Sequence, residues 1–243
     1  MELPQNGFVR QDEYWPCDSP QYQAGNGLAN RKKPPLSEIP GDKFDRQRVI
    51  PGFDQGLVER QTCLVLGAGG IGQNVALALA RLGVARVILV DCDVYEASNL
   101  PRQCLGQPSQ VGHRKVDAAL ESLRCGHNLR SALEGHHLDV VLEWGQVVAL
   151  AKRSDVVFNG IDIGAMWDHA INGLCLELSL PLVAGSSVGW CLNVELYSGR
   201  AGTLCQACSS QPSPEVFELG KPGAFAQRLG AWLADRQQQQ EEE

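Results

Sequence analysis

The chain has 243 residues, 44% hydrophobic and 20% charged, which is typical of a soluble α/β protein with one large domain or two small ones. Its formal net charge of −7 argues against a broad basic face for nucleic acid, and no apolar run reaches the ~18–20 residues of a membrane helix. The first residues lack the basic and then apolar pattern of a secretion signal, so we expect a cytoplasmic protein with reduced cysteines.

The two ends of the sequence differ in composition from its middle. Residues 1–42 carry six of the thirteen prolines among glycine, asparagine and glutamine, which predicts an irregular or disordered arm. Residues 211–243 end in a low-complexity run of glutamine and glutamate. We therefore expect one folded domain over residues 43–210.

Apolar strands and amphipathic helices alternate through this domain. The pattern predicts strands at 63–66, 86–90, 140–142, 155–158, 181–184 and 193–197. It predicts helices at 75–82, 115–123, 147–152 and 167–180. This alternation favours an α/β fold: a Rossmann-like, doubly wound and mostly parallel sheet with helices on both faces.

A glycine-rich loop follows the first strand and opens a helix. It contains Gly67, Gly69, Gly70 and Gly72, and an acidic residue, Asp91, lies 19 residues beyond Gly72. Glycines let the backbone approach a phosphate, and an acid at this distance accepts hydrogen bonds from ribose hydroxyls. The motif therefore predicts a nucleotide site, and by itself it favours NAD and ATP about equally.

Polar groups further along the chain favour ATP. Asn99, Arg102 and Lys115 cluster beyond the ribose acid, and Asp162 ends a predicted strand. A dehydrogenase needs no such cluster, whereas nucleotidyl transfer needs cations where charge develops on the phosphates. An acid at the carboxyl edge of a parallel sheet can also hold Mg²⁺ between phosphates.

The joint pattern resembles the MoeB/ThiF family, the adenylating enzymes for ubiquitin-like sulfur-carrier proteins, which are related to ubiquitin-activating enzymes. The matching segments cover about two thirds of the chain in the family's order and spacing. They are FDRQRVIPGF (44–53), GAGGIG (67–72), DCDVYEASNLPRQ (91–103), VGHRKVDAA (111–119), DVVFNGID (155–162), Asn172 with Cys175, PLVAGSS (181–187), and Cys205 with Cys208.

The resemblance implies a role for each matching residue. The glycine loop and Asp91 would hold adenosine and phosphates, Asp162 would coordinate Mg²⁺, and Arg46 would reach the ATP site of the neighbouring subunit in a homodimer. The phosphates would be bound by Asn99, Arg102 and Lys115, with Gln103 beside them and Asp93 either at the nucleotide or capping a turn. The implied substrate is a ubiquitin-like or sulfur-carrier protein ending in Gly-Gly, adenylated on its terminal carboxylate with release of pyrophosphate.

The sequence departs from the family pattern at several places, one of which is Leu192, where the family usually has a glycine. Trp167 stands where the family usually has an arginine, five residues after the metal-binding acid. Cys205 and Cys208 form half of a zinc ribbon, and no cysteine follows them in the shortened C-terminal segment. Because a structural zinc takes four protein ligands, we expect little or no zinc.

The sequence is also compatible with three other functions. One is a catalytically impaired paralogue that acts as a heterodimer partner. Another is a tRNA-modifying dehydratase of the same superfamily, against which the acidity of the chain argues mildly. The last is an NAD-dependent dehydrogenase, which the cationic cluster disfavours. Adenylation of a carrier protein is the leading hypothesis, with no nucleic acid or membrane partner.

Overall fold

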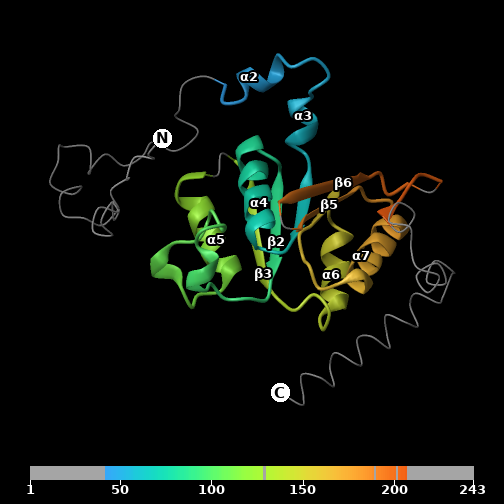
Figure 1. The fold of residues 1–243 in the computed structure, drawn as a ribbon. Coiled ribbons are helices and arrows are strands. Elements are labelled where there is room, and N and C mark those ends of the chain that lie inside the picture. The colour runs from blue at the N-terminus through green and yellow to red at the C-terminus, as the bar shows by residue number, and fades with distance from the viewer. Residues whose placement is uncertain (1–41, 128–129, 189, 201, 207–243) are drawn as a thin grey trace, which may run out of the picture. The chain divides into compact units, whose positions relative to one another are not determined.

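The structure, a computed structural model, describes residues 42–127, 130–188, 190–200 and 202–206 (Figure 1). The predicted arm, apart from its last residue, and the segment 211–243 lie outside these residues. Within the described residues, six strands form one sheet in the order β3-β2-β1-β4-β5-β6, and only the β5–β6 pair among them is antiparallel. The strands are β1 (Thr62–Leu66), β2 (Arg86–Asp91), β3 (Ala132–His137), β4 (Val156–Asn159), β5 (Leu182–Val188) and β6 (Cys191–Tyr197).

The helices of the described chain alternate with these strands. The α-helices are α2 (Asp45–Arg48), α3 (Gln55–Val58), α4 (Gly70–Leu82), α5 (Lys115–Ser122), α6 (Trp144–Ala151) and α7 (Ala165–Leu178). Single turns of other helix types are η3 (Ala97–Asn99), η4 (Pro108–Gln110) and η5 (Leu123–His127). The predicted Rossmann-like, doubly wound α/β fold is confirmed. None of the described helices has the length and apolar character needed to cross a bilayer.

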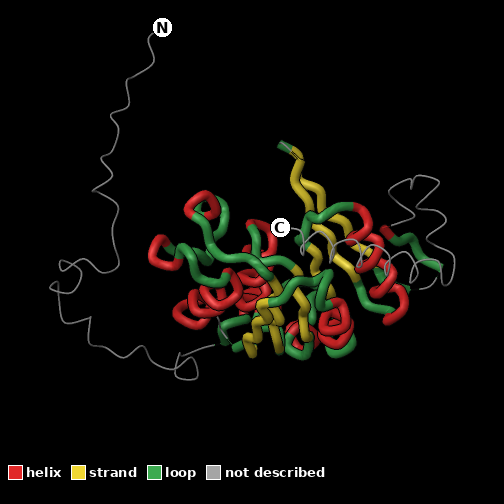
Figure 2. Tube along the Cα trace, turned by 90° about the horizontal axis from the view of Figure 1, so that it is seen from below, coloured by secondary structure: helices red, strands yellow, loops and turns green. Residues whose placement is uncertain are grey.

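Alternate side chains of β1 point into two separate cores. Leu64 and Leu66 pack with apolar residues of α6 and α7, whereas Cys63 and Val65 pack with those of α4 and α5. Helices accordingly lie on both sides of the sheet (Figure 2). A strand covered on both faces is apolar at every position, which is why β1 reads as a continuous hydrophobic run.

The predicted strand at 140–142 is wrong. Val140 and Val141 are buried in the core beside α6, but they lie in turns rather than in the sheet. The strand in this part of the chain is β3, which pairs with β2 at the edge of the sheet and contains Glu134, Gly135 and two histidines. An edge strand is largely exposed and needs no apolar pattern, so periodicity does not reveal it.

Glu134 joins β3 to its surroundings through several charged groups. Its carboxylate accepts hydrogen bonds from Arg86 Nη1 at 2.9 Å, from His136 Nε2 at 2.7 Å and from the Arg153 guanidinium. Partial burial works to raise the pKa of Glu134, but these hydrogen bonds outweigh it and lower the pKa to about 2. Charges along an edge strand also oppose pairing with other chains.

We expect Glu134→Gln to lower the free energy of unfolding at pH 7 by about 1 kcal/mol, because exposed ion pairs contribute 0.2–1 kcal/mol each. A carboxyl whose pKa is lowered on folding stabilises above its unfolded value near 4.5, and this stabilisation is lost as the pH falls toward 2. Denaturant titrations at pH 7 and pH 3 should therefore show a smaller difference at pH 3. Glu177→Gln, an exposed change on α7, should have no such effect; equal losses in both variants would contradict the prediction.

Candidate active site

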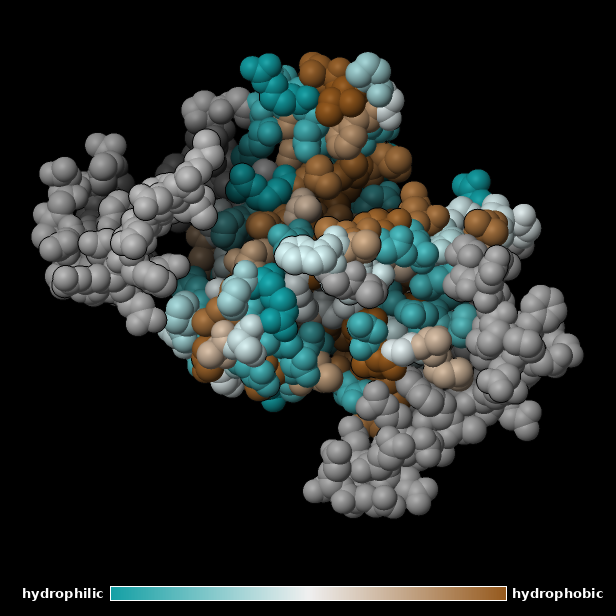
Figure 3. Space-filling model, in the orientation of Figure 1, coloured by the Kyte–Doolittle hydropathy of each residue, from teal (hydrophilic) through white to brown (hydrophobic). Residues whose placement is uncertain are grey.

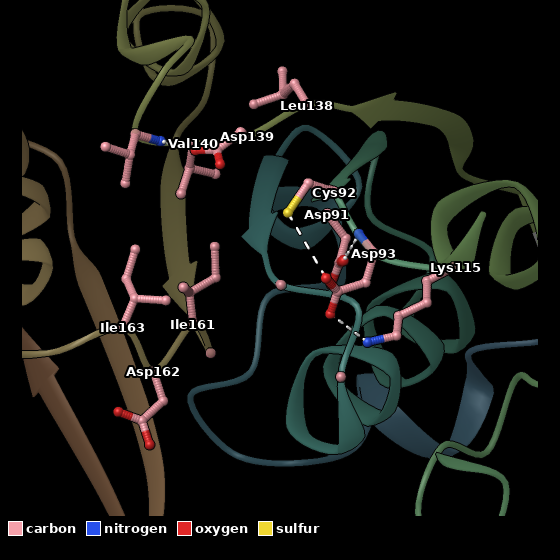
Figure 4. Close-up of a pocket in the computed structure, with 14 residues that line it drawn as sticks. Asp91, Cys92, Asp93, Lys115, Leu138, Asp139, Val140, Ile161, Asp162 and Ile163 are labelled. Atoms are coloured by element: carbon pink, nitrogen blue, oxygen red, sulfur yellow. Dashed lines mark hydrogen bonds and ion pairs between the residues drawn. The ribbon is translucent and has the colours of Figure 1, made fainter. Parts of the chain in front are cut away.

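A cleft of about 290 Å³ opens at the carboxyl ends of the parallel strands. It lies where the chain leaves β1 and β4, which are neighbours in the sheet but lead to helices on opposite faces. Doubly wound sheets bind ligands at such a point. The lining residues are Gly67, Gly69, Asp91, Cys92, Asp93, Lys115, Leu138, Asp139, Val140, Val141, Gly160, Ile161, Asp162 and Ile163 (Figure 4).

The glycine loop can be built only with glycine at two of its positions. Gly67 has a φ of 93°, and a Cβ there would lie 3.1 Å from the carbonyl oxygen of Gly160. A Cβ on Gly72 would lie 1.8 Å from the carbonyl oxygen of Gly67. The loop leads directly into α4, whose N-cap Gly69 has no side chain to cap the first amides. These amides and the helix dipole suit an anion such as phosphate.

Asp91 holds the glycine loop as well as lining the cleft. Its Oδ2 accepts a hydrogen bond from the Ala68 amide at 2.6 Å, and its Oδ1 accepts one from the Asp93 amide at 2.7 Å. Both carboxylate oxygens therefore have backbone donors in this structure. The acid that the sequence placed at the ribose thus also ties the end of β2 to the turn after β1.

Lys115 is buried at the start of α5, and its Nζ lies 2.6 Å from Asp93 Oδ2. The pair lies on the β2 side of the cleft, across from Asp162 (Figure 4). The lining carries the carboxylates of Asp91, Asp93, Asp139 and Asp162, and Lys115 is the only cationic side chain among the lining residues described. A polyphosphate therefore needs further positive charge to enter this cleft.

Asp162 follows β4 by three residues and is exposed at the cleft. Among the described residues, its side chain makes no hydrogen bond or ion pair. Mg²⁺ prefers a few carboxylate oxygens together with substrate phosphates and water. An unpaired carboxylate facing a phosphate-type glycine loop fits that preference.

Other predicted site residues lie beside the cleft rather than in its lining. Asn99 is buried and closes the η3 turn, with its Oδ1 accepting from the Glu96 amide at 3.3 Å. Arg102 is exposed and donates to the Ser98 carbonyl at 2.8 Å, and its backbone lies against Gly70. The segment thus borders the first turn of α4, where the glycine loop ends.

Gln73, which sequence reasoning missed, connects the glycine loop to this bordering segment. It is fully buried in α4, and its Nε2 donates to the Ala68 carbonyl at 2.7 Å and to the hydroxyl of Tyr95. The same Nε2 lies 3.3 Å from Gln103 Oε1, and Gln73 Oε1 accepts from the Leu105 amide at 2.8 Å. A polar residue on the apolar face of α4 was the signal that could have revealed it.

Arg46 lies far from the cleft of its own chain. Phe44, just before α2, packs against Gly83 at the end of α4, and Gln55 Nε2 donates to the Leu82 carbonyl at 3.0 Å. The thirteen residues of α4 span about 20 Å between this end and the glycine loop. Arg46 is exposed there and makes no ion pair with the described residues.

The predicted half zinc ribbon is only partly described. Cys205 is buried, whereas Cys208 lies outside the described residues. Asn172 is a buried residue of α7, and its Oδ1 accepts a hydrogen bond from the Gln206 amide at 3.0 Å. This bond holds the chain next to Cys205 against the helix. The expectation of little or no zinc stays a prediction, which elemental analysis of the purified chain would check.

The fold and the cleft together define a doubly wound α/β protein with a glycine loop of the phosphate-binding type. The chain belongs to the ThiF family, whose model matches residues 44–230. It is 30% identical over 202 residues to the adenylyltransferase and sulfurtransferase MOCS3-2 of Zea mays, covering 81% of this chain and 40% of that protein. The chain thus spans about two fifths of the length of this relative.

Two further proteins are similar to the chain. The molybdopterin-synthase adenylyltransferase of Escherichia coli is 27% identical over 172 residues, covering 70% of this chain and 68% of that protein. The crystal structure of E. coli MccB with ATP matches with a TM-score of 0.58 and 24% identity, covering 74% of this chain and 54% of the MccB chain. This structural match supports the fold.

Proposed function

We propose that residues 43–210 form an adenylation domain that uses ATP and Mg²⁺ to activate a ubiquitin-like or sulfur-carrier protein. The activated group is the carboxylate of a C-terminal glycine, and pyrophosphate is released. The observation that carries the proposal is the cleft itself, where the glycine loop and Lys115 face Asp162 across the β1–β4 junction. Membership in the ThiF family and the adenylyltransferase relatives support it.

The reaction needs positioning more than side-chain chemistry. A carboxylate oxygen of the terminal glycine attacks the α-phosphorus, and the bond between that phosphorus and the β-phosphate oxygen breaks. Pyrophosphate leaves with the electron pair, and the carrier remains as an acyl-adenylate. The attacking carboxylate is already ionised, so no general base is required. The amides at the start of α4 and the Lys115 ammonium would hold the phosphates in line.

The charge of the cleft supports a divalent cation and a second subunit. Four carboxylates and one ammonium line it, so a triphosphate would meet net negative charge without added cations. Mg²⁺ at Asp162 would neutralise the phosphate oxygens and the developing charge on pyrophosphate. Arg102 borders the cleft, and Arg46 of a second copy would supply another cation. We therefore propose a homodimer with composite sites.

ATP–pyrophosphate exchange tests the proposed function directly. Exchange should require Mg²⁺ and a carrier protein ending in Gly-Gly, because it reports reversible formation of the acyl-adenylate. NAD should not compete with ATP. Exchange that appears only when an active relative is added would instead indicate an impaired paralogue acting in a heterodimer, and binding of NAD without ATP would exclude the proposal.

An exposed apolar face on β6 suits the carrier protein. Leu192, Val194 and Leu196 alternate along the strand and are 78%, 74% and 74% exposed, while Tyr197 points to the opposite side and is buried in the core. Figure 3 shows this hydrophobic surface over β6. The strand begins opposite the carboxyl end of β5, at the edge of the sheet where the cleft opens. A protein bound there could extend its C-terminus toward the nucleotide.

We expect Val194→Glu to raise the KM for the carrier in the exchange assay at least tenfold, because a charge would be buried at the centre of an apolar contact. The KM for ATP should not change. Val111→Glu, at an exposed valine outside this face, serves as the matched control. A loss of dimerisation with unchanged carrier KM would assign the face to a second copy of the chain.

A cytoplasmic location agrees with this function. The thiols of Cys92, Cys104 and Cys191 are free and exposed in the described structure. Exposed free thiols persist best in a reducing compartment, and we propose the cytoplasm on that ground.

A further inference from the structure

One buried amide connects the loop that carries Asp162 to the helix that follows it. Asn159, the last residue of β4, has only 4% of its surface exposed. Its Oδ1 accepts hydrogen bonds from Trp167 Nε1 at 2.9 Å and from the Ile161 amide at 3.3 Å. Its Nδ2 donates to Asp168 Oδ1 at 3.1 Å. Residues 160–163 all line the cleft. The loop that they form starts directly after Asn159, whose side chain is held by two residues of α7.

The chemistry of the partners fixes the orientation of this amide. An indole and a backbone amide can only donate, and an ionised carboxylate can only accept. The three contacts are therefore compatible with one orientation of the Asn159 side chain, with oxygen toward Trp167 and nitrogen toward Asp168. Burial works to raise the pKa of Asp168 to about 6, and the nearby carboxylates of Asp162 and Glu195 act in the same direction, against the Asn159 hydrogen bond.

Trp167 is itself held rigidly. It is fully buried in the first turn of α7, and its ring meets that of Trp144 edge to face, with centroids 6.0 Å apart and planes at 88°. Trp144 opens α6, which packs in the same core. The indole N–H is thus a fixed donor, anchored by two helices, at the base of the loop.

We propose that Trp167, acting through Asn159, is a positioning residue for the loop that bears Asp162. The inference rests on the proposed function for its catalytic consequence and on the contacts above for its structural one. Gly160 is bonded separately to β1, through its amide and the Leu66 carbonyl at 2.9 Å, so Asn159 governs the loop from Ile161 onward. Loss of the indole donor removes the shortest of the three contacts that hold the Asn159 side chain, and so weakens its hold on the Ile161 amide.

The first experiment compares Trp167→Phe with Trp144→Phe in the full chain. Phenylalanine keeps an aromatic ring but removes the donor that meets Asn159 together with part of the indole volume. The change at Trp144 removes a similar volume from the same core but no donor to Asn159, and so controls for lost packing. We measure amide hydrogen exchange over the loop, above all at Ile161, whose amide donates to Asn159, without ATP or carrier and together with the unfolding midpoint. Trp167→Phe should speed loop exchange about tenfold or more, as expected for a lost buried hydrogen bond, and Trp144→Phe should leave it within about twofold.

The second experiment reverses one hydrogen bond. Asn159→Asp keeps the acceptor for Trp167 and Ile161 but sets two carboxylates against each other at the Asp168 contact. Adding Asp168→Asn restores a donor and acceptor there. The single change should lower the maximal ATP–pyrophosphate exchange rate about tenfold with the carrier KM unchanged, and the double change should recover most of it.

The outcomes separate the two proposals. Loop amides that exchange at the normal rate in Trp167→Phe, or a double variant no better than Asn159→Asp, would overturn the positioning role. A wild-type chain that protects these amides in the expected way but shows no ATP–pyrophosphate exchange with any Gly-Gly carrier would instead overturn the proposed function. Equal effects of Trp167→Phe and Trp144→Phe on the loop amides would mean that both rings act only through general packing, against the proposal.

Discussion

Asp162→Ala should lower the rate of ATP–pyrophosphate exchange at least ~100-fold, on the scale of removing one preorganised electrostatic group. The side chain reaches the cleft from the end of β4 without a hydrogen bond or ion pair to any described residue, and the lining carries a single cation, Lys115. Removing the carboxylate would therefore remove the group proposed to hold Mg²⁺ between the glycine loop and β4. Exchange measured across a range of Mg²⁺ concentrations checks the expectation.

Asp117→Ala is the matched control, because it removes an exposed carboxylate from α5 outside the cleft. It should exchange at nearly the normal rate. The unfolding midpoint of Asp162→Ala should stay close to that of the unchanged chain, since its side chain is exposed and makes no hydrogen bond or ion pair with the described residues. Near-normal exchange in Asp162→Ala would show that the metal is held elsewhere.

Arg46→Ala should lower exchange by about 100-fold or more, and mixing its subunits with Asp162→Ala subunits should restore part of the activity. Each mixed dimer contains one site with an intact Asp162 that faces a subunit with an intact Arg46. The geometry favours this arrangement, because about 20 Å of helix α4 separates Arg46 from the glycine loop of its own chain. Exchange assays on mixtures, after subunit exchange has been demonstrated by mass, make the measurement.

Arg48→Ala provides a matched control two residues away. Arg48 is already engaged, with its Nε 2.5 Å from Asp42 Oδ2 and its Nη2 3.6 Å from Glu59 Oε1, so its loss should affect local stability and leave exchange nearly intact. Valine and isoleucine at positions 49 and 50 are exposed beside Arg46, as an interface with a second copy would require. No recovery in mixtures of proven heterodimers would mean that Arg46 serves its own site or none.

Much of the fold was predictable because its central strands are covered on both faces. The apolar runs at 63–66 and 86–90 correspond to β1 and β2, and the glycine loop between strand and helix fixes where the chain turns. The glycines at 67 and 72 belong to the site for a local reason, since Gly67 has a positive φ and a Cβ at Gly72 would collide with the Gly67 carbonyl. These features depend on near neighbours along the chain or on burial alone.

The position of β3, and the buried side chains that support the loops of the cleft, could not be predicted from local pattern or burial. β3 is an edge strand without an apolar pattern, and Val140 and Val141 line the cleft from turns although their sequence favours a strand. The hydrogen-bond partners of Gln73 lie up to 32 residues away in the chain. Those of Asn159 lie within nine residues, but on the helix and loop that follow its strand. Their roles depend on which side chains the packing brings within hydrogen-bonding distance.

By itself, the sequence determined the class of fold, the positions of its central strands, the glycine loop and the acids at the ends of β2 and β4. Only the tertiary structure decided that Asp91 ties two loops together, that Trp167 anchors the loop of Asp162, and that Arg46 lies at the far end of α4. The reason is physical: periodicity and glycine spacing report local conformation and burial, which neighbouring residues set. The direction of a buried hydrogen bond and the placement of Arg46 at the far end of α4 are set by how whole segments pack against one another.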